Sequence, residues 1–521
     1  MNRRSHLPTR LTTAVLTIAL LAVSGRAQEK KPHEPKAQPP AAQQANKSTV
    51  APTEQSTVTE HTLALNGETI HYTATAGNLL IRDAKNKPNG SMFYVAYTED
   101  GVAAQDRPVT FLYNGGPGSS TIWLHMGSFG PMRIETASPE ATPPAPYHLV
   151  PNQYSLLDKT DLVFIDAMGT GFSRPVDKGT LKDFIGVDED VHAFNKFITR
   201  YLTVNGRWDS PKFLIGESYG TTRSAALAYS LQQSGISLNG VVLISSILNF
   251  NDITAGGDTN FIGDLPSFAA IAWYHNKLAN KPADLQAFLA QARTYARGPY
   301  AEALWQGDNL SAAEEDQVAQ KLSQLTGVSA QYWKEANLRL TASNFRKELM
   351  RGDRRTLGRY DARFEGFDSQ AIGANPSYDP SDTGIAGAFV AAFHTYLADD
   401  LKYSTDESYK ATAYGPNFKW DWKHKTPHGS EERFPDVALD LAAAMRENPH
   451  LLLFSGNGYF DLATPFFKTE FDIDHMELPP SIQKNVRFRY YPSGHMIYLN
   501  VQALKQLKSD LAQFYSDAVA Q

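Results

Sequence analysis

Ser218, Asp461 and His495 are three side chains whose types could together carry out nucleophilic catalysis. A serine hydroxyl is a weak nucleophile until a base accepts its proton, and histidine is the usual base. A carboxylate that is hydrogen-bonded to the histidine orients the ring and stabilises its charged form. Taken singly, each of the three is an ordinary loop residue, so the elements around them decide whether they can act together.

Each of these side chains is expected at the end of a strand. Ser218 lies in Gly216-Glu-Ser-Tyr-Gly220, between an apolar run and a helical pattern. This is the context of a nucleophile elbow, a sharp strand-to-helix turn that exposes the serine hydroxyl. Asp461 and His495 each follow a further apolar run. Open α/β sheets bind ligands beyond the carboxyl ends of their strands, so we expect the three side chains to meet there.

The glycine-rich segment Asn114-Gly-Gly-Pro-Gly-Ser-Ser120 could complete such a site. Attack on a carbonyl group generates an oxyanion, which backbone N–H groups can stabilise. We expect one donor to be the N–H of Tyr219 and the second to come from this segment. A phosphate-binding loop is the competing interpretation, but the segment lacks both the Gly-Lys-Ser/Thr ending and the Gly-x-Gly-x-x-Gly spacing.

Alternating strand and helix patterns predict the fold. The chain opens with an antiparallel meander, in which Asn66-Gly67 is a strong signal for a hairpin turn. Strands then alternate with amphipathic helices, which is typical of a mostly parallel sheet with helices on its faces. The predicted strands are 61–65, 69–73, 79–81, 92–97, 108–113, 161–165, 212–215, 241–244, 451–454 and 486–490, and the predicted helices are 188–202, 219–231, 436–446 and 501–515.

One long segment interrupts this alternation. Residues 251–432 are mostly helical in pattern and rich in aromatic side chains. We therefore expect one α/β-hydrolase fold in two parts, 57–250 and 433–521, with a helical cap inserted between them. Within the cap, the stretch 346–363 carries seven basic residues interleaved with acidic ones. We interpret this stretch as a solvated surface of the cap.

The composition excludes several classes of protein. The net charge is −6, from 49 basic and 55 acidic residues, so nothing predicts nucleic acid as a partner. Because the chain has no cysteine, it has no disulfide, cysteine nucleophile or lipoprotein anchor. The histidines show no metal-binding spacing. We expect neither a metal nor another cofactor. The sequence does not predict the oligomeric state.

The N-terminus resembles an export signal. Residues 1–27 combine early arginines, a 13-residue apolar run and a small-x-small ending at Ala27, so we expect cleavage there. The run is short for a membrane span, and we expect no stable membrane anchor. Residues 28–56 have the Pro/Ala/Gln-rich composition of a disordered linker. The mature protein is expected in a bacterial periplasm or outside the cell.

Four motifs together resemble the serine carboxypeptidase family, peptidase family S10, and the N-terminal meander resembles that of its bacterial members. These motifs are Asn114-Gly-Gly-Pro-Gly-Ser-Ser120, Gly169-Thr-Gly-Phe-Ser173, Gly216-Glu-Ser-Tyr-Gly220 and Gly494-His-Met496. They span about residues 107 to 500 in the order that the family shows. The resemblance implies an exopeptidase that releases residues from peptides with a free C-terminus through an acyl-enzyme intermediate.

The resemblance also implies a role for each matching residue. Ser218 would be the nucleophile, His495 the general base and then acid, and Asp461 the partner of His495. The N–H groups of Gly116 and Tyr219 would form the oxyanion hole. Asn114 and Glu217 would bind the C-terminal carboxylate of the substrate. Two carboxylates repel unless one is protonated, so a protonated Glu217 predicts a preference for acidic pH.

Four positions depart from the family pattern. Leu112 stands where members usually have tryptophan, Ser119 where they usually have cysteine, and Ser128 where many have a second glutamate. The usual Gly-Asp-x-Asp before the catalytic aspartate is Gly458-Tyr-Phe-Asp461. These changes leave the triad and oxyanion hole intact but alter carboxylate recognition. Another serine hydrolase or acyltransferase, acting on esters or amides, and a non-catalytic peptide-binding relative are therefore the alternatives.

Overall fold

The computed structural model describes residues 52–251, 257–416 and 418–520. The predicted signal peptide and most of the predicted linker lie outside the described residues. The end of that linker makes specific contacts, because Glu54 forms an ion pair with Arg200 at 2.7 Å and the first strand begins at Ser56.

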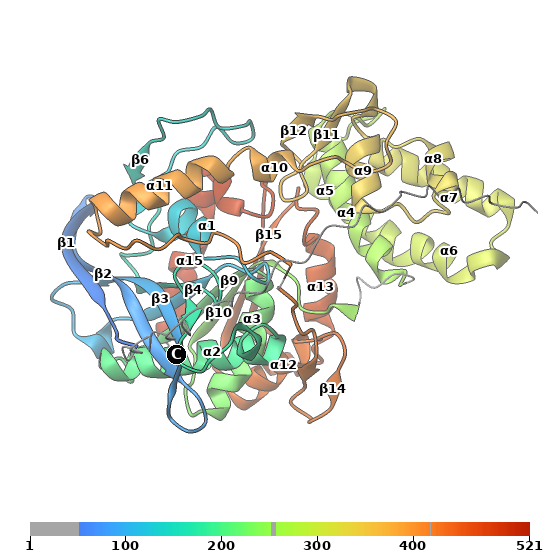
Figure 1. Ribbon diagram of the computed structural model, residues 1–521. Helices are drawn as coiled ribbons and strands as arrows, with labels where there is room; N and C mark the ends of the chain where they lie inside the picture. Colours follow the sequence, from blue (N-terminus) through green and yellow to red (C-terminus); the bar gives the residue numbers. More distant parts are fainter. Residues whose placement is uncertain (1–51, 252–256, 417, 521) are drawn as a thin grey trace, which may run out of the picture. The chain divides into compact units, whose positions relative to one another are not determined.

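A central, mostly parallel sheet organises the chain (Figure 1). Its strand order is β1-β2-β3-β7-β4-β9-β10-β15-β16. The pairs from β7 to β16 are parallel, whereas β1, β2 and β3 pair antiparallel with one another and β3 pairs antiparallel with β7. The strands are β1 (Ser56–Leu65), β2 (Glu68–Arg82), β3 (Pro88–Glu99), β4 (Val109–Tyr113), β7 (Asp161–Ile165), β9 (Lys212–Ser218), β10 (Gly240–Ser246), β15 (Leu452–Gly458) and β16 (Val486–Tyr491).

The N-terminal meander has the predicted hairpin turn, but two predicted strands, 79–81 and 108–113, differ from expectation. Asn66 and Gly67 form the predicted turn with φ angles of 54° and 86°, as a tight hairpin requires. The predicted strand 79–81 is the end of one long strand, β2, because pairing with β3 continues past Gly77. The run 108–113 becomes β4, which lies between β7 and β9 and is parallel to both.

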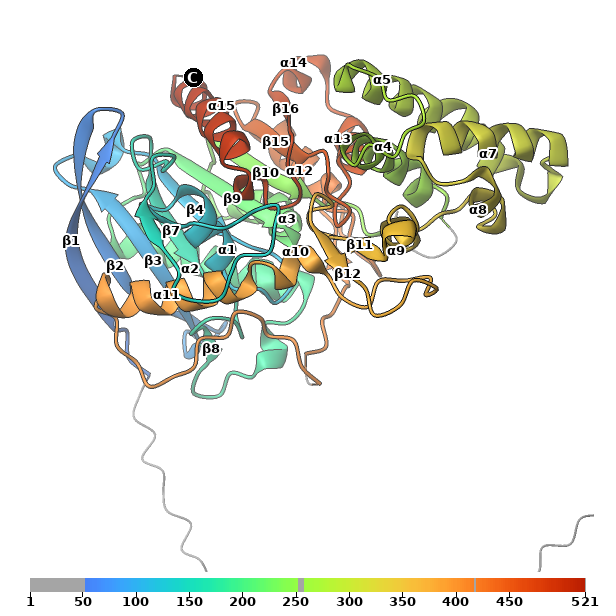
Figure 2. The same ribbon diagram turned by 90° about the horizontal axis from the view of Figure 1, so that it is seen from above.

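Helices cover both faces of the sheet (Figures 1 and 2). One hydrophobic cluster joins the sheet to α2 (Val187–Val204), α3 (Tyr219–Gln233) and α12 (Ala438–Glu447). A second cluster joins it to α11 (Ala386–Asp399) and α15 (Val501–Val519). Burial of apolar side chains on both faces explains why the central strands are continuous apolar runs.

The segment between β10 and β15 is inserted between two adjacent strands of the sheet. Its helices α4 to α9 share a third hydrophobic cluster. These helices are α4 (Thr259–Tyr274), α5 (Leu285–Tyr295), α6 (Ala301–Gln306), α7 (Ala312–Thr326), α8 (Ala330–Glu335) and α9 (Ala342–Glu348). They meet the sheet domain at α13 (Phe466–Asp474), which contacts α4. Helix α11 belongs to the same insertion in sequence but packs on the sheet domain.

Two short strands, β11 (Arg355–Leu357) and β12 (Glu365–Phe367), form a hairpin between α9 and α11. The tip of this hairpin, residues 358–364, reaches the loops that follow β15 and β16, since Ala362 N donates a hydrogen bond to Phe460 O at 2.9 Å and His495 N donates one to Tyr360 O at 2.6 Å. The insertion therefore contacts the end of the sheet where the candidate side chains lie.

Candidate active site

Ser218 is the last residue of β9 and directly precedes α3. Its backbone has φ 61° and ψ −131°, a conformation that residues with a side chain rarely adopt. Such a turn is possible because Gly220 leaves space: a Cβ there would lie 2.7 Å from Tyr113 O. The strained turn places Ser218 at the carboxyl end of the sheet, as the nucleophile-elbow pattern predicts.

His495 and Asp461 form a hydrogen-bonded pair. The distance from His495 Nδ1 to Asp461 Oδ2 is 2.7 Å, and both side chains are buried. Burial lowers the pKa of His495, but the neighbouring Asp461 carboxylate outweighs burial, so the pKa is raised above its ordinary value. The aspartate therefore favours the protonated imidazolium that forms when histidine accepts a proton.

Thr464 holds this pair in place, and sequence reasoning missed it. Its hydroxyl donates a hydrogen bond to Asp461 Oδ2 at 2.6 Å and lies 3.1 Å from His495 Nδ1. The backbone N–H groups of Ala463 and Thr464 donate to Asp461 Oδ1 at 2.7 and 3.0 Å. A hydroxyl three residues after a loop aspartate is a local signal for such a turn.

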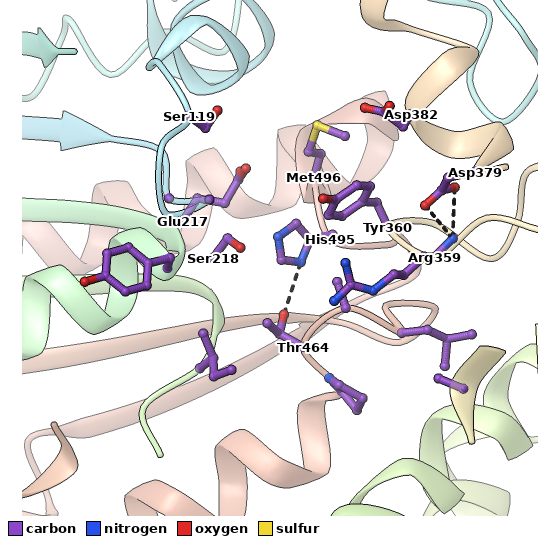
Figure 3. Close-up of a pocket in the computed structure, with 18 of the residues that line it drawn as sticks. Ser119, Glu217, Ser218, Arg359, Tyr360, Asp379, Asp382, Thr464, His495 and Met496 are labelled. Atoms are coloured by element: carbon purple, nitrogen blue, oxygen red, sulfur yellow. Dashed lines mark hydrogen bonds between the residues drawn. The ribbon is translucent and has the colours of Figure 1, made fainter. Parts of the chain in front are cut away.

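The candidate residues surround one pocket of about 860 Å³. Ser218 and His495 line it, and Figure 3 shows the Ser218 hydroxyl pointing toward the imidazole. Asn114, Gly116, Glu217 and Tyr219 line the same pocket, whereas Asp461 lies buried behind His495. The structure thus brings together all seven side chains or backbone groups that the sequence singled out.

The predicted oxyanion donors come from two closely packed segments. Tyr219 is the first residue of α3, where a backbone N–H has no partner within the helix. A Cβ at Gly115 would clash with the backbone N of Tyr219, so the glycine lets the 114–120 segment approach the helix start. Gly116, at φ 107°, follows directly and lines the pocket.

Asn114 and Glu217 are hydrogen-bonded to each other at the pocket wall. Asn114 Nδ2 donates to Glu217 Oε1 at 2.7 Å, and the Tyr498 hydroxyl donates to the same oxygen at 3.3 Å. Burial raises the pKa of Glu217 to about 7. Among the described residues, Glu217 Oε2 has no hydrogen-bond partner although it is buried. Sequence reasoning missed Tyr498, which follows His495 by one short turn.

The positions that depart from the family pattern have other contacts. Leu112 is buried in the sheet. The Ser128 hydroxyl donates a hydrogen bond to Leu124 O at 2.6 Å and does not line the pocket. Ser119 lines the pocket and accepts a hydrogen bond from Trp123 Nε1 at 3.0 Å. Ser128 therefore provides no second carboxyl group at the pocket.

The basic stretch 346–363 is only in part the solvated surface that the sequence suggested, since Arg354 is exposed. Arg346, Lys347 and Arg363 are buried. Arg346 and Arg359 line the pocket. The interleaved charges that indicated a solvated surface pair with one another within the cap, for example Arg363 with Asp361 at 2.5 Å.

The described part of the chain contains neither a cluster of metal ligands nor a membrane-spanning helix. Within it, no three His, Asp or Glu side chains are grouped as metal ligands would be. Over the same residues, no helix is both long enough and apolar enough to span a membrane.

Comparisons with known proteins show which proteins this chain is similar to. The profile of the family described as serine carboxypeptidase, peptidase family S10, matches residues 67–508. Serine carboxypeptidase-like 36 of Arabidopsis thaliana is 25% identical over 174 residues, which are 32% of this chain and 34% of the relative. The pheromone-processing carboxypeptidase of Saccharomyces cerevisiae, strain JAY291, is 31% identical over 156 residues, 28% of this chain and 20% of the relative. The matches thus span about a third of the first relative and a fifth of the second.

A solved structure shows the same fold. It is a prohormone-processing carboxypeptidase from Saccharomyces cerevisiae, with a TM-score of 0.51, 16% identity, and coverage of 85% of this chain and 91% of that one. At this identity the likeness bears on the fold alone. It confirms the predicted α/β-hydrolase fold with a mostly parallel sheet.

Proposed function

From the premise that this chain belongs to the serine carboxypeptidase family, we propose that it hydrolyses C-terminal peptide bonds with Ser218, His495 and Asp461 as catalytic residues. The family match confirms the resemblance expected from the four sequence motifs. The arrangement of a strained serine turn, a buried histidine-aspartate pair and a shared pocket supports the proposed roles.

The first half of the reaction forms an acyl-enzyme. Ser218 Oγ attacks the carbonyl carbon of the last peptide bond while His495 Nε2 accepts the hydroxyl proton. The negative oxygen of the tetrahedral intermediate accepts hydrogen bonds from the N–H groups of Gly116 and Tyr219. His495 then donates its proton to the departing amine, the C–N bond breaks, and the C-terminal residue leaves.

The second half regenerates the enzyme. His495 accepts a proton from a water molecule, whose oxygen attacks the ester carbonyl carbon. Collapse of the second tetrahedral intermediate breaks the bond to Ser218 Oγ, which takes back the proton from His495. In each half His495 first accepts a proton and then donates it, and the reaction consumes only the peptide and one water molecule.

One observation carries the assignment of exopeptidase specificity. The buried oxygen Glu217 Oε2 lacks a partner among the described residues and belongs to a pocket-lining side chain next to Ser218. Since the pKa of Glu217 is raised to about 7, this carboxyl group is protonated in mild acid and can donate a hydrogen bond to a substrate carboxylate. Asn114, which binds the other oxygen at 2.7 Å, keeps the group oriented.

Cleavage of matched peptides tests this function. A peptide with a free C-terminus should lose its last residue, whereas the C-terminally amidated form should be cleaved roughly ten-fold less efficiently, since a neutral hydrogen bond then replaces the charge-assisted one to Glu217. Ser218→Ala should abolish cleavage, and Ser343→Ala, at another serine that lines the same pocket, is the control. Equal cleavage of both peptides would favour a general serine hydrolase or acyltransferase. The observation that favours this alternative is that Ser128 stands where many family members have a second glutamate, and its hydroxyl donates to Leu124 O.

Labelling by a fluorophosphonate separates the enzyme from a non-catalytic relative. We expect a covalent adduct on Ser218 in the unmodified protein and none in Ser218→Ala. A folded protein without an adduct would leave only peptide binding as a function.

We also propose that residues 1–27 direct export and are removed. Mass spectrometry of the protein recovered from a bacterial host should find Gln28 as the first residue. A protein that retains its first 27 residues would contradict this proposal.

A further inference from the structure

The tip of the β11–β12 hairpin is fixed to both loops that carry the proposed base and its partner. His495 N donates a hydrogen bond to Tyr360 O at 2.6 Å, and Leu462 N donates to Arg359 O at 3.0 Å. A Cβ at Gly494 would lie 2.5 Å from Tyr360 O, so the two segments are in close contact. The position of the hairpin tip is therefore set by the catalytic loops themselves.

Arg359 extends from this tip into the pocket. Its backbone N–H is anchored by both oxygens of Asp379, at 3.0 and 3.2 Å. Its guanidinium carbon lies 5.6 Å from the ring centroid of Tyr360, whose ring in turn lies 5.3 Å from that of His495. Figure 3 shows the guanidinium reaching toward His495 and Thr464. The side chain is exposed to the pocket and not buried in the cap.

The other basic side chains of the pocket already have acidic partners. Lys468 Nζ lies 2.7 Å from Asp264 Oδ1. Arg346 Nη2 lies 3.7 Å from Asp379 Oδ1, and its Nε donates to Leu357 O at 2.8 Å.

In the described part of the chain, by contrast, no carboxylate pairs with the guanidinium of Arg359. Its planar set of N–H donors matches the two oxygens of a carboxylate. The pocket thus presents a cation without a protein partner beside the proposed base.

The C-terminal carboxylate of a substrate is not the group that this cation would meet. Figure 3 shows Glu217 beside Ser218, and Arg359 on the far side of His495. A peptide whose terminal carboxylate contacts Glu217 would present a different group to Arg359. The substrate groups that can contact Arg359 from there are the side chains on either side of the scissile bond.

We propose that Arg359 is a specificity-determining residue that binds an acidic side chain next to the scissile bond. This inference rests on the proposed carboxypeptidase function. The substrates favoured would be peptides with glutamate or aspartate at one of the two terminal positions. A lysine or arginine at the same position would be repelled by the guanidinium.

Blocked dipeptides with a free C-terminus provide the test. They carry Glu, Gln, Leu or Lys at either of the two positions, and kcat/KM is measured at about pH 6, where a glutamate side chain is ionised. Glu should exceed its isostere Gln by roughly ten-fold or more at one position, as a charge-assisted hydrogen bond implies. Arg359→Met should bring this ratio to about one, and Arg359→Glu should invert the order of Glu and Lys. Arg297→Met, an exposed arginine outside the pocket, should keep the original ratio.

Three outcomes would overturn the inference for an active enzyme. The first is equal cleavage of Glu and Gln substrates at both positions, and the second is a preference that Arg359→Met leaves unchanged. The third is an equal loss for all substrates in Arg359→Met, which would show that Arg359 acts on His495 or on the shared carboxylate. The rate of fluorophosphonate labelling of Ser218 monitors the fold and the triad in each variant.

Binding measurements separate this inference from the proposed function. Ser218→Ala cannot form an acyl-enzyme, so calorimetric Kd values for the Glu and Gln dipeptides report recognition alone. Tighter binding of the Glu peptide, lost in Ser218→Ala/Arg359→Met, supports the role of Arg359 even if no peptide is cleaved. Equal Kd values contradict it, whereas absence of cleavage and of labelling contradicts only the proposed function.

Discussion

Asn114 Nδ2 donates a hydrogen bond to Glu217 Oε1 at 2.7 Å, inside the pocket that contains Ser218. This bond uses one carboxyl oxygen and leaves the other without a partner among the described residues. Burial raises the pKa of Glu217 to about 7, so the group holds its proton up to near-neutral pH. The pKa of the proposed base is linked to this proton, because ionised Glu217 is one of the charges that raise the pKa of His495 against the effect of burial.

Glu217→Gln is expected to change the pH profile of peptide cleavage. In the unmodified enzyme, the protonated donor is present below about pH 7 and is lost as the pH rises through that value, so kcat/KM should fall on the alkaline side. Glutamine donates at every pH, so this fall should disappear. The acid limb, where His495 becomes protonated, should keep its position, because Glu217 is already neutral at those pH values. Stopped assays of kcat/KM from about pH 4 to 9 measure both limbs.

An unchanged profile in Glu217→Gln would rule out the role of Glu217 as the titrating donor. An ester substrate that lacks a free carboxylate provides the control, because its alkaline limb should not depend on Glu217.

Thr464→Val is expected to lower kcat with little effect on KM. The hydroxyl of Thr464 fixes Asp461 at 2.6 Å, and without it the carboxylate loses one of its hydrogen bonds. A loss of about 1 kcal/mol would reduce kcat roughly five-fold. Thr464→Ser, which keeps the hydroxyl, should restore most of the activity. If Thr464→Ser is as slow as Thr464→Val, the methyl packing of Thr464 and not its hydroxyl positions Asp461.

Gly115→Ala is expected to impair transition-state stabilisation. A Cβ there would collide with the backbone N of Tyr219, so the 114–120 segment would have to move away from the start of α3. Loss of one oxyanion donor typically costs about a hundred-fold or more in kcat. Gly298→Ala, where a Cβ would meet no atom within 4 Å, is the control. A Gly115→Ala enzyme with unaltered kcat and thermal midpoint would contradict the proposed role of this segment.

The sequence predicted the parts of the site that are encoded locally. Ser218, Asp461 and His495 each follow an apolar run that becomes a strand of a parallel sheet, and the ends of such strands meet by topology. The Asn66-Gly67 turn was predictable for a similar reason, because its dihedral angles suit few other residue pairs.

The remaining parts depend on contacts between distant segments. Tyr498 reaches Glu217, which is 281 positions away in sequence, and no local pattern indicates this contact. Arg359 was assigned to a solvated surface because its neighbours alternate in charge, whereas hydrogen bonds to Leu462 and Asp379 direct it into the pocket. Helix α11 has an apolar composition, but composition does not determine whether it packs on the cap or on the sheet.

His424 should stabilise the fold in a pH-dependent manner. Its buried imidazole bridges two carboxylates, with Nδ1 2.7 Å from Asp188 Oδ1 and Nε2 2.9 Å from Asp440 Oδ2. Burial lowers the pKa of His424, but hydrogen bonds to both aspartates outweigh burial and raise it to about 10. The stabilisation is therefore complete below the unfolded pKa of about 6.5 and is lost as the pH rises through about 10.

His424→Phe keeps the ring volume but leaves Asp440 buried without its cation, which should cost about 3–5 kcal/mol at neutral pH. Urea unfolding followed by tryptophan fluorescence measures the difference from the unmodified protein. That difference should shrink above about pH 10, where the native imidazole is also neutral. His192→Phe, at an exposed histidine of α2, is the matched control and should unfold like the unmodified protein. A difference that stays constant from neutral to alkaline pH would show that packing, and not the charge of His424, links α2, which carries Asp188, to α12, which carries Asp440.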